Sequence, residues 1–108
     1  MKLEDAASRL EALGNPTRLR VYRALVKAGH PGLPVGKLQT RLGVPASTLS
    51  HHLKTLLIAG LITQDRDATT LYCKANYTVM RGLVSFLVEE CCTGADCASI
   101  RQQADTAV

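Results

Sequence analysis

The chain has 108 residues, with 13 Lys and Arg against 9 Asp and Glu and a formal net charge of +4. This length predicts a single domain, and the 46% hydrophobic content is enough for an aliphatic core although Trp is absent. The longest apolar run, residues 56–62, is too short to span a membrane. No secretory signal pattern opens the sequence, so we expect a cytoplasmic protein whose four cysteines are thiols.

The charges are distributed unevenly along the chain. Carboxylates occur at Glu4, Asp5 and Glu11 and then not again until Asp65, whereas seven Lys and Arg residues lie between residues 12 and 64. A basic block of this kind is typical of a protein that binds a polyanion, but a solvated basic face would give the same composition. The organisation of the block has to decide between the two.

The first half of the chain predicts three helices. Residues 3–13 carry apolar side chains at spacings of three and four, and Asn15-Pro16 is a typical start for a second helix over residues 16–28. Residues 29–34 are rich in Gly and Pro and are expected to form a loop. A short third helix over residues 35–42 should end at Gly43.

Residues 46–60 predict a helix with two distinct faces. Leu49, Leu53 and Leu56 recur at helical spacing and should face the core. Small polar residues and one base recur at the same spacing on another side: Ser47, Ser50, His51 and Lys54. A short helix, a turn with glycine and a helix with such an outer face are typical of a helix-turn-helix.

The second half predicts a hairpin and a last helix. Residues 61–64 and 69–74 are expected to form strands around a charged four-residue tip, residues 65–68. An apolar stripe then predicts a helix over residues 78–90, which Cys91 and Cys92 should end. The predicted fold is mainly α with one β-hairpin, a winged helix-turn-helix over residues 1–92 followed by a tail over residues 93–108. The first and last helices stand outside this core, and we expect them to pair across a two-fold axis in a homodimer.

Three motifs resemble the ArsR/SmtB family of metal-sensing repressors. They are Leu-Gly-Asn-Pro-Thr-Arg-Leu-Arg at residues 13–20, Ser-Thr-Leu-Ser-His-His-Leu-Lys at residues 47–54 and Ala-Gly-Leu-Ile at residues 59–62. The resemblance extends over roughly residues 3–92 and implies a dimeric repressor that leaves its operator when an inducer binds. Pro45 departs from the family pattern, because a polar cap often precedes the recognition helix there.

The predicted recognition helix offers candidate DNA contacts. Ser47, Thr48, Ser50 and His51 could hydrogen-bond to base edges or phosphates, while Lys54 and Arg66 are candidates for phosphates of double-stranded operator DNA. Ser47 and Thr48 could instead cap the helix start. His52 borders the leucine side of the helix, so we expect it to be packed rather than to read bases.

Three of the four cysteines lie within seven residues, at Cys91, Cys92 and Cys97. Adjacent cysteines have Cα atoms about 3.8 Å apart, below the usual disulfide range of about 4.4–6.8 Å, so Cys91 and Cys92 should not form a structural disulfide. Three thiolates favour a soft, three-coordinate ion such as arsenite or antimonite over four-coordinate zinc. The cluster is also similar to that of some arsenic-responsive ArsR regulators. Cys73, in the predicted wing, is expected to be a buried hydrophobe.

The sequence therefore predicts a repressor of an arsenic-resistance operon. Trivalent arsenic would bind to Cys91, Cys92 and Cys97 and release the repressor from its operator. A thiol-based redox or persulfide sensor of the same fold is the main alternative. A thiol enzyme or a metalloid carrier that binds no DNA is a third reading. The sequence disfavours an enzyme because it has no Cys-x-x-Cys pair, no His–carboxylate arrangement beside a nucleophile and no glycine-rich phosphate loop.

Overall fold

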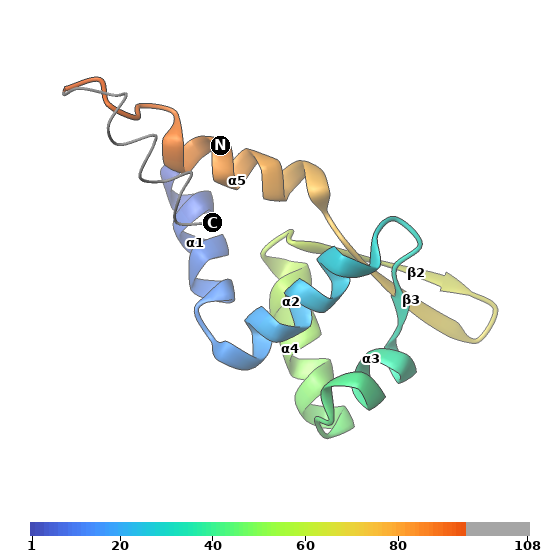
Figure 1. The fold of residues 1–108 in the computed structure, drawn as a ribbon. Coiled ribbons are helices and arrows are strands. Elements are labelled where there is room, and N and C mark those ends of the chain that lie inside the picture. The colour runs from blue at the N-terminus through green and yellow to red at the C-terminus, as the bar shows by residue number, and fades with distance from the viewer. Residues whose placement is uncertain (95–108) are drawn as a thin grey trace.

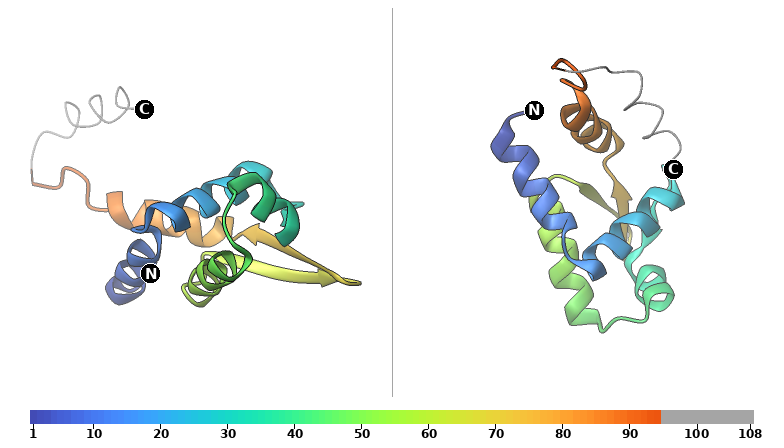
Figure 2. Two further views of the ribbon diagram at one scale, coloured as in Figure 1. Left: turned by 90° about the horizontal axis from the view of Figure 1, so that it is seen from below. Right: turned by 60° about the vertical axis from the view of Figure 1, so that its left-hand side comes forward.

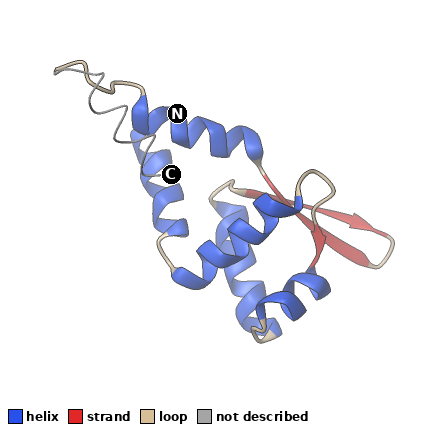
Figure 3. Cartoon of the chain, viewed as in Figure 1, coloured by secondary structure: helices blue, strands red, loops and turns tan. Residues whose placement is uncertain are grey.

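The computed structural model describes residues 1–94 and shows helices arranged around a small sheet (Figures 1 and 3). The elements in chain order are α1 (Leu3–Leu13), α2 (Pro16–Ala28), β1 (Leu33–Pro34), α3 (Val35–Leu42), α4 (Ala46–Ile58), β2 (Ile62–Asp67), β3 (Thr70–Ala75) and α5 (Tyr77–Val88). The predicted winged helix-turn-helix is confirmed: α3 and α4 form the helix-turn-helix, and β2 and β3 form the wing. None of the described helices is long and apolar enough to cross a bilayer.

Capping residues determine where α2 and α5 begin. The Asn15 side chain accepts hydrogen bonds from the backbone N–H groups of Thr17 and Arg18, and Pro16 occupies the first helical position. The start of α5 differs by one residue from the prediction because Asn76 caps the helix by accepting from the Val79 N–H. The ends of α4 and α5, at Ile58 and Val88, come two residues earlier than predicted.

The sheet differs from the predicted hairpin in two ways. Its strand order is β1-β3-β2, all antiparallel, so the predicted loop over residues 29–34 contains a short strand whose Leu33 pairs with Cys73. The predicted four-residue tip was wrong as well. The β2–β3 ladder continues to Asp67 opposite Thr70, which leaves a two-residue turn with Ala68 at a φ of 55°. Charged residues fit this ladder because its far end is exposed to solvent on both faces.

The core lies where α2, α3 and α4 cover the sheet (Figure 2). Its fully buried side chains include Leu49 and Leu56 of the recognition helix and also Cys73, as expected for a small hydrophobe, and Leu53 is 3% exposed. The largest of them are Val21, Leu25, Leu38, Leu49, Leu56, Leu61, Ile62 and Cys73. This aliphatic core fixes the side of α4 that faces inward and therefore the side that faces out.

Two helices carry apolar side chains into solvent. In α1, Leu3 and Leu10 are exposed to 68% and 42%, and in α5, Val84, Leu87 and Val88 are each more than half exposed. Helices α1 and α5 lie side by side at the end of the molecule remote from α3 (Figures 1 and 2). We refer to these five residues below as the α1/α5 face.

Candidate functional site

The outer surface of α4 carries most of the predicted DNA contacts. Five of the six predicted contact residues lie on this helix, and all five are exposed: Ser47, Thr48, Ser50, His51 and Lys54. Leu49, Leu53 and Leu56 are buried on the opposite side. The helix thus presents short polar side chains and a base outward, as a recognition helix in a major groove requires.

Capping does not occupy the polar residues at the start of α4. Pro45 is the N-cap residue and makes no side-chain hydrogen bond, and the Ser47 and Thr48 hydroxyls bond to no other described residue. The alternative in which Ser47 and Thr48 cap the helix is therefore wrong for this structure. Their hydroxyls are available to an external partner.

The wing brings further polar groups beside the recognition helix. A hollow of about 250 Å³ lies between α4 and the sheet, and Ser50, Lys54 and Gln64 are among the residues that line it. Arg66, the sixth predicted contact, lies in the exposed part of β2, inside the strand rather than at a loop tip. The ion pair between Lys74 Nζ and Asp65, at 3.0 Å, is also solvent-exposed and adds little to stability.

Helix α3 contributes two cations that sequence reasoning did not single out. Lys37 and Arg41 are exposed, and together with Thr40 they line a surface hollow. Lys37 also lines a second hollow with Thr69 and Thr70 of the wing. The carboxylate-free block was the available signal in the sequence, but only the fold shows that Lys37 lies beside the wing turn.

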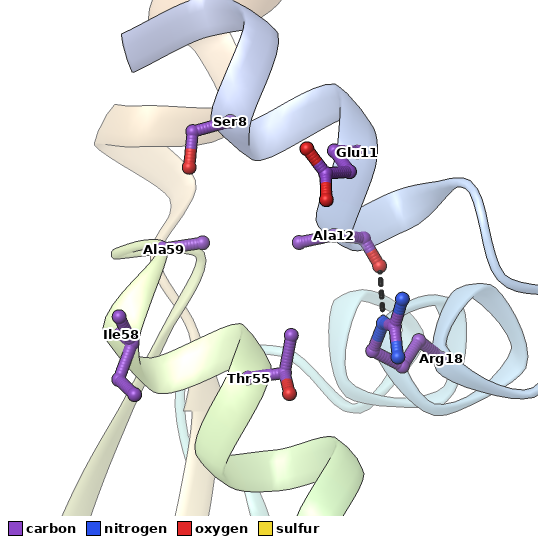
Figure 4. Close-up of a pocket in the computed structure, with 7 residues that line it drawn as sticks. All are labelled: Ser8, Glu11, Ala12, Arg18, Thr55, Ile58 and Ala59. Carbon is purple, nitrogen blue, oxygen red and sulfur yellow. Dashed lines mark hydrogen bonds between the residues drawn. The ribbon is translucent and has the colours of Figure 1, made fainter.

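Arg18 belongs to the same basic block but turns inward. Its Nε donates to the backbone oxygen of Ala12 at 2.7 Å, near the end of α1, and its Nη1 lies 3.5 Å from Nδ1 of His52 on α4. Figure 4 shows the guanidinium directed at Ala12 in the cavity of about 200 Å³ between α1 and α4. Arg18 therefore joins the end of α1 to the recognition helix.

Arg9 makes a second link between the same two helices. Its Nε donates to the backbone oxygen of Ala59, the residue that follows α4, at 3.1 Å. Two arginines thus tie α1 to α4, one at the middle of the recognition helix and one at its C-terminal end. These links set the position of α4 relative to α1.

His52 is packed, as predicted from the sequence. It is 9% exposed, and burial lowers the pKa of its imidazole, with further lowering by the Arg18 guanidinium and by His51. The neutral ring has Nδ1 free to accept from Arg18. Because a protonated ring would place two cations together in a poorly solvated site, His52 is neutral at pH 7.

Cys91 and Cys92 lie in the turn that follows α5 and do not end the helix as predicted. The Cys91 N–H donates to the Val88 oxygen at 2.9 Å, and Cys92 has a left-handed backbone with a φ of 66°. The two sulfur atoms are 3.2 Å apart, beyond the disulfide bond length of about 2.05 Å. The two thiols are therefore in contact without a disulfide bond.

The third predicted ligand, Cys97, lies outside the described residues. Within residues 1–94, no group of three His, Cys, Asp or Glu side chains is placed to hold a metal ion. Cys73 is fully buried, burial raises the pKa of its thiol, and Gln64 Nε2 donates to its sulfur at 3.5 Å. Among the described cysteines, Cys91 and Cys92 are partly exposed, whereas Cys73 is buried.

Comparisons with known proteins agree with this geometry. A family model described as a helix-turn-helix domain matches residues 13–65. The transcriptional regulator YgaV of Escherichia coli is 32% identical over 89 residues, which cover 82% of this chain and 88% of YgaV. The nodulation protein NolR of Rhizobium meliloti is 41% identical over 69 residues, 64% of this chain, and the match spans 54% of NolR's own length.

Solved structures show the same fold. NolR from Sinorhizobium fredii superposes with a TM-score of 0.64 at 34% identity and covers 86% of this chain and 88% of its own. A homodimeric winged helix-turn-helix domain from Mycobacterium bovis, described as a possible ArsR-family regulator, gives 0.66 at 28% identity, covering 82% of both chains. A possible transcriptional regulator for arsenical resistance also gives 0.66, at 27% identity, covering 76% and 82%.

The fold and the exposed recognition helix define a DNA-binding transcriptional regulator. The chain belongs to the ArsR/SmtB-like family of winged helix-turn-helix regulators. This is a family of DNA-binding proteins rather than of enzymes.

Replacing Lys54 with Gln tests the DNA-facing side of α4. Because Lys54 is expected to neutralise one phosphate, Lys54→Gln should weaken binding to duplex DNA and reduce the slope of log affinity against log salt by about 1 per subunit. Fluorescence anisotropy over a range of salt concentrations measures both. Arg81→Gln, which removes an exposed cation from α5, is the matched control and should leave the slope unchanged. Equal slopes for wild type and Lys54→Gln would contradict the assignment.

His52 should make stability depend on pH. Its pKa is lower in the folded than in the unfolded chain, so the unfolded state binds more protons as the pH falls through the ordinary histidine range near 6.5. The stability that the neutral ring provides is present above that range and is lost below it. His52→Asn keeps an acceptor for Arg18 but does not titrate, so urea unfolding at pH 7.5 and 5.5 should show a smaller loss than wild type. An identical loss would show that His52 does not cause it.

Proposed function

We propose that the protein is a homodimeric repressor that binds a two-fold symmetric operator and is released from it by trivalent arsenic. The observation that carries the DNA-binding part is the exposed polar side of α4 beside the wing and the basic α3. The recognition helix of each subunit would lie in the major groove, with Lys54, Arg66 and the bases of α3 on the flanking phosphates. Dimer, inducer and coupling each rest on a separate observation.

The α1/α5 face supports a homodimer. Its five exposed apolar residues lie on two adjacent helices, and an exposed apolar patch on a small domain is typical of a protein–protein interface. A two-fold axis would place the same surface of each subunit against the other. The related domain from Mycobacterium bovis is described as homodimeric, which supports the same assembly here.

The sulfur pair supports a thiophilic inducer. Cys91 and Cys92 place two sulfur atoms 3.2 Å apart just beyond α5, and Cys97 follows five residues later as the proposed third ligand. Three thiolates satisfy trivalent arsenic, and antimonite would fit the same ligands. A relative described as a possible regulator for arsenical resistance has the same fold, which supports this choice of inducer.

The two arginine links offer a route from the thiol site to the DNA. Cys91 and Cys92 follow α5, and α5 packs against α1. Arg18 links α1 to the middle of α4, and Arg9 links α1 to the C-terminal end of α4. Ligation that shifts α5 would move α1 and so re-space the two recognition helices of the dimer. Couplings of this kind are about 1–3 kcal/mol, or about 5–150-fold in affinity.

A thiol redox or persulfide switch is the second candidate. It would use Cys97 and one of the two adjacent cysteines, because Cys91 and Cys92 lie in the turn beyond α5, five to six residues before Cys97, whereas a disulfide between adjacent cysteines is disfavoured. It keeps the DNA-binding assignment and changes only the inducer. Loss of two free thiols after mild peroxide, reversed by a reductant, would support it.

The dimer predicts that a charge on the α1/α5 face separates the subunits. Val84→Asp places a carboxylate among exposed apolar residues that would be buried between subunits, so the variant should be monomeric at micromolar concentration. Ser85→Asp, at the next exposed position of α5, should stay dimeric. Light scattering after gel filtration gives the mass of each. A monomeric wild type, or a dimeric Val84→Asp, would contradict the proposed interface.

The arsenic assignment predicts release of DNA that depends on Cys97. The reduced wild type should lose affinity for labelled DNA from its own upstream region by about tenfold or more when arsenite is added, whereas Cys97→Ser should stay bound. Cys73→Ala should respond like wild type because Cys73 is buried in the core. Anisotropy titrations with arsenite measure this. If wild type and Cys97→Ser both stay bound, arsenite is not the inducer and the redox switch becomes the leading account.

A further inference from the structure

A buried histidine meets an arginine where α1, α2 and α4 come together. The imidazole of His52, on α4, is 9% exposed, and its Nδ1 lies 3.5 Å from Nη1 of Arg18 on α2. The same guanidinium donates through Nε to the backbone oxygen of Ala12 on α1. Nδ1 can accept a hydrogen bond only while it carries no proton, so the contact between Arg18 and His52 requires a neutral ring.

The charged groups around this ring do not compensate a second positive charge. Arg18 approaches it from α2, and the ring of His51, the preceding residue on α4, lies 5.9 Å from it between centroids. On α1, Arg9 is directed at the end of α4, while Glu11 is exposed and forms no ion pair with another residue in the range 1–94. The charged residues of β2 are exposed to solvent. A protonated His52 would therefore have cations beside it and, within the described part of the chain, no carboxylate paired with it.

Protonation of His52 would break the contact with Arg18. It removes the acceptor on Nδ1 and places two cations side by side in a partly buried site, which is unfavourable. The cavity of about 200 Å³ between α1 and α4, which Arg18 lines, gives the guanidinium room to move away from the ring (Figure 4). Burial lowers the pKa of His52, and Arg18 and His51 lower it further, so the ring is protonated only below the ordinary histidine value of about 6.5.

We propose that His52 and Arg18 form a pH-sensitive switch that weakens DNA binding as the medium becomes acidic. The inference rests on the proposed DNA-binding function of α4 and is independent of the inducer. Neutral His52 connects α4 through Arg18 to α1, and the DNA-bound form uses α4 in this position. Protonation removes the connection, so uptake of a proton by His52 and binding of DNA by α4 oppose each other.

The test is the affinity of the full chain for labelled DNA from its own upstream region, measured by anisotropy at constant ionic strength from about pH 8 to about pH 5. Wild type should lose about fivefold or more in affinity, whereas His52→Asn and Arg18→Gln should show no such loss. His30→Asn removes an exposed histidine outside α4 and should lose as much as wild type. His51→Asn should lose at least as much, because a protonated His51 would attract phosphates and oppose the switch.

NMR of the wild type without DNA supplies a second readout. The Nε–H signal of Arg18 should lose its protection from solvent exchange over the same pH range in which the ring signals of His52 titrate. Should one of the two variants fail to fold, the other variant and this titration decide.

Three results would overturn the switch. They are an equal loss of affinity in wild type and His52→Asn, an Arg18 signal that stays protected while His52 becomes protonated, and unfolding of the wild type at about pH 5 by circular dichroism, since the loss of affinity would then be denaturation. Absence of DNA binding already at about pH 8 would instead overturn the proposed function itself, and the switch with it.

Discussion

The guanidinium of Arg18 connects the recognition helix to the first helix. Arg18 donates to the Ala12 oxygen near the end of α1 and approaches Nδ1 of His52 in the middle of α4. Both contacts are partly buried. With Arg9 at the C-terminal end of α4, α1 is connected to α4 at two points. A shift of α1 would therefore be passed on to the surface proposed to face DNA.

The other elements of the molecule are arranged around α4 and α1. The aliphatic core turns the polar side of α4 outward, and the wing and α3 place bases beside it. The α1/α5 face offers the surface through which two subunits would fix the spacing of their recognition helices. The sulfur pair lies just beyond α5, at the end of the element that packs on α1. A ligand held there would act far from DNA yet next to the helices that contact α4.

The sequence predicted the parts of this arrangement that local chemistry decides. Helix starts at Asn15-Pro16 and the two faces of α4 follow from capping and periodicity. The short strand β1 was missed because Leu33 becomes a strand residue only by pairing with Cys73, forty residues later. Likewise, Arg18 was counted with a basic surface, since nothing in its neighbourhood in sequence shows that it points at Ala12 and His52. Five of the six predicted DNA contacts lie on the exposed side of α4, as expected from the periodicity. Cys97, the third predicted metal ligand, lies outside the described residues.

Coupling through Arg18 between the cysteines and the DNA-binding surface can be tested by one ratio, the DNA affinity without arsenite divided by the DNA affinity with arsenite. DNA affinity is measured with and without arsenite for wild type, Arg18→Gln and, as a control on the same helix, the exposed Arg20→Gln. The account predicts that arsenite weakens DNA binding of wild type and Arg20→Gln alike. In Arg18→Gln we expect this ratio of DNA affinities to fall towards 1, although the variant should still fold and bind arsenite. An Arg18→Gln ratio equal to that of wild type would contradict the account.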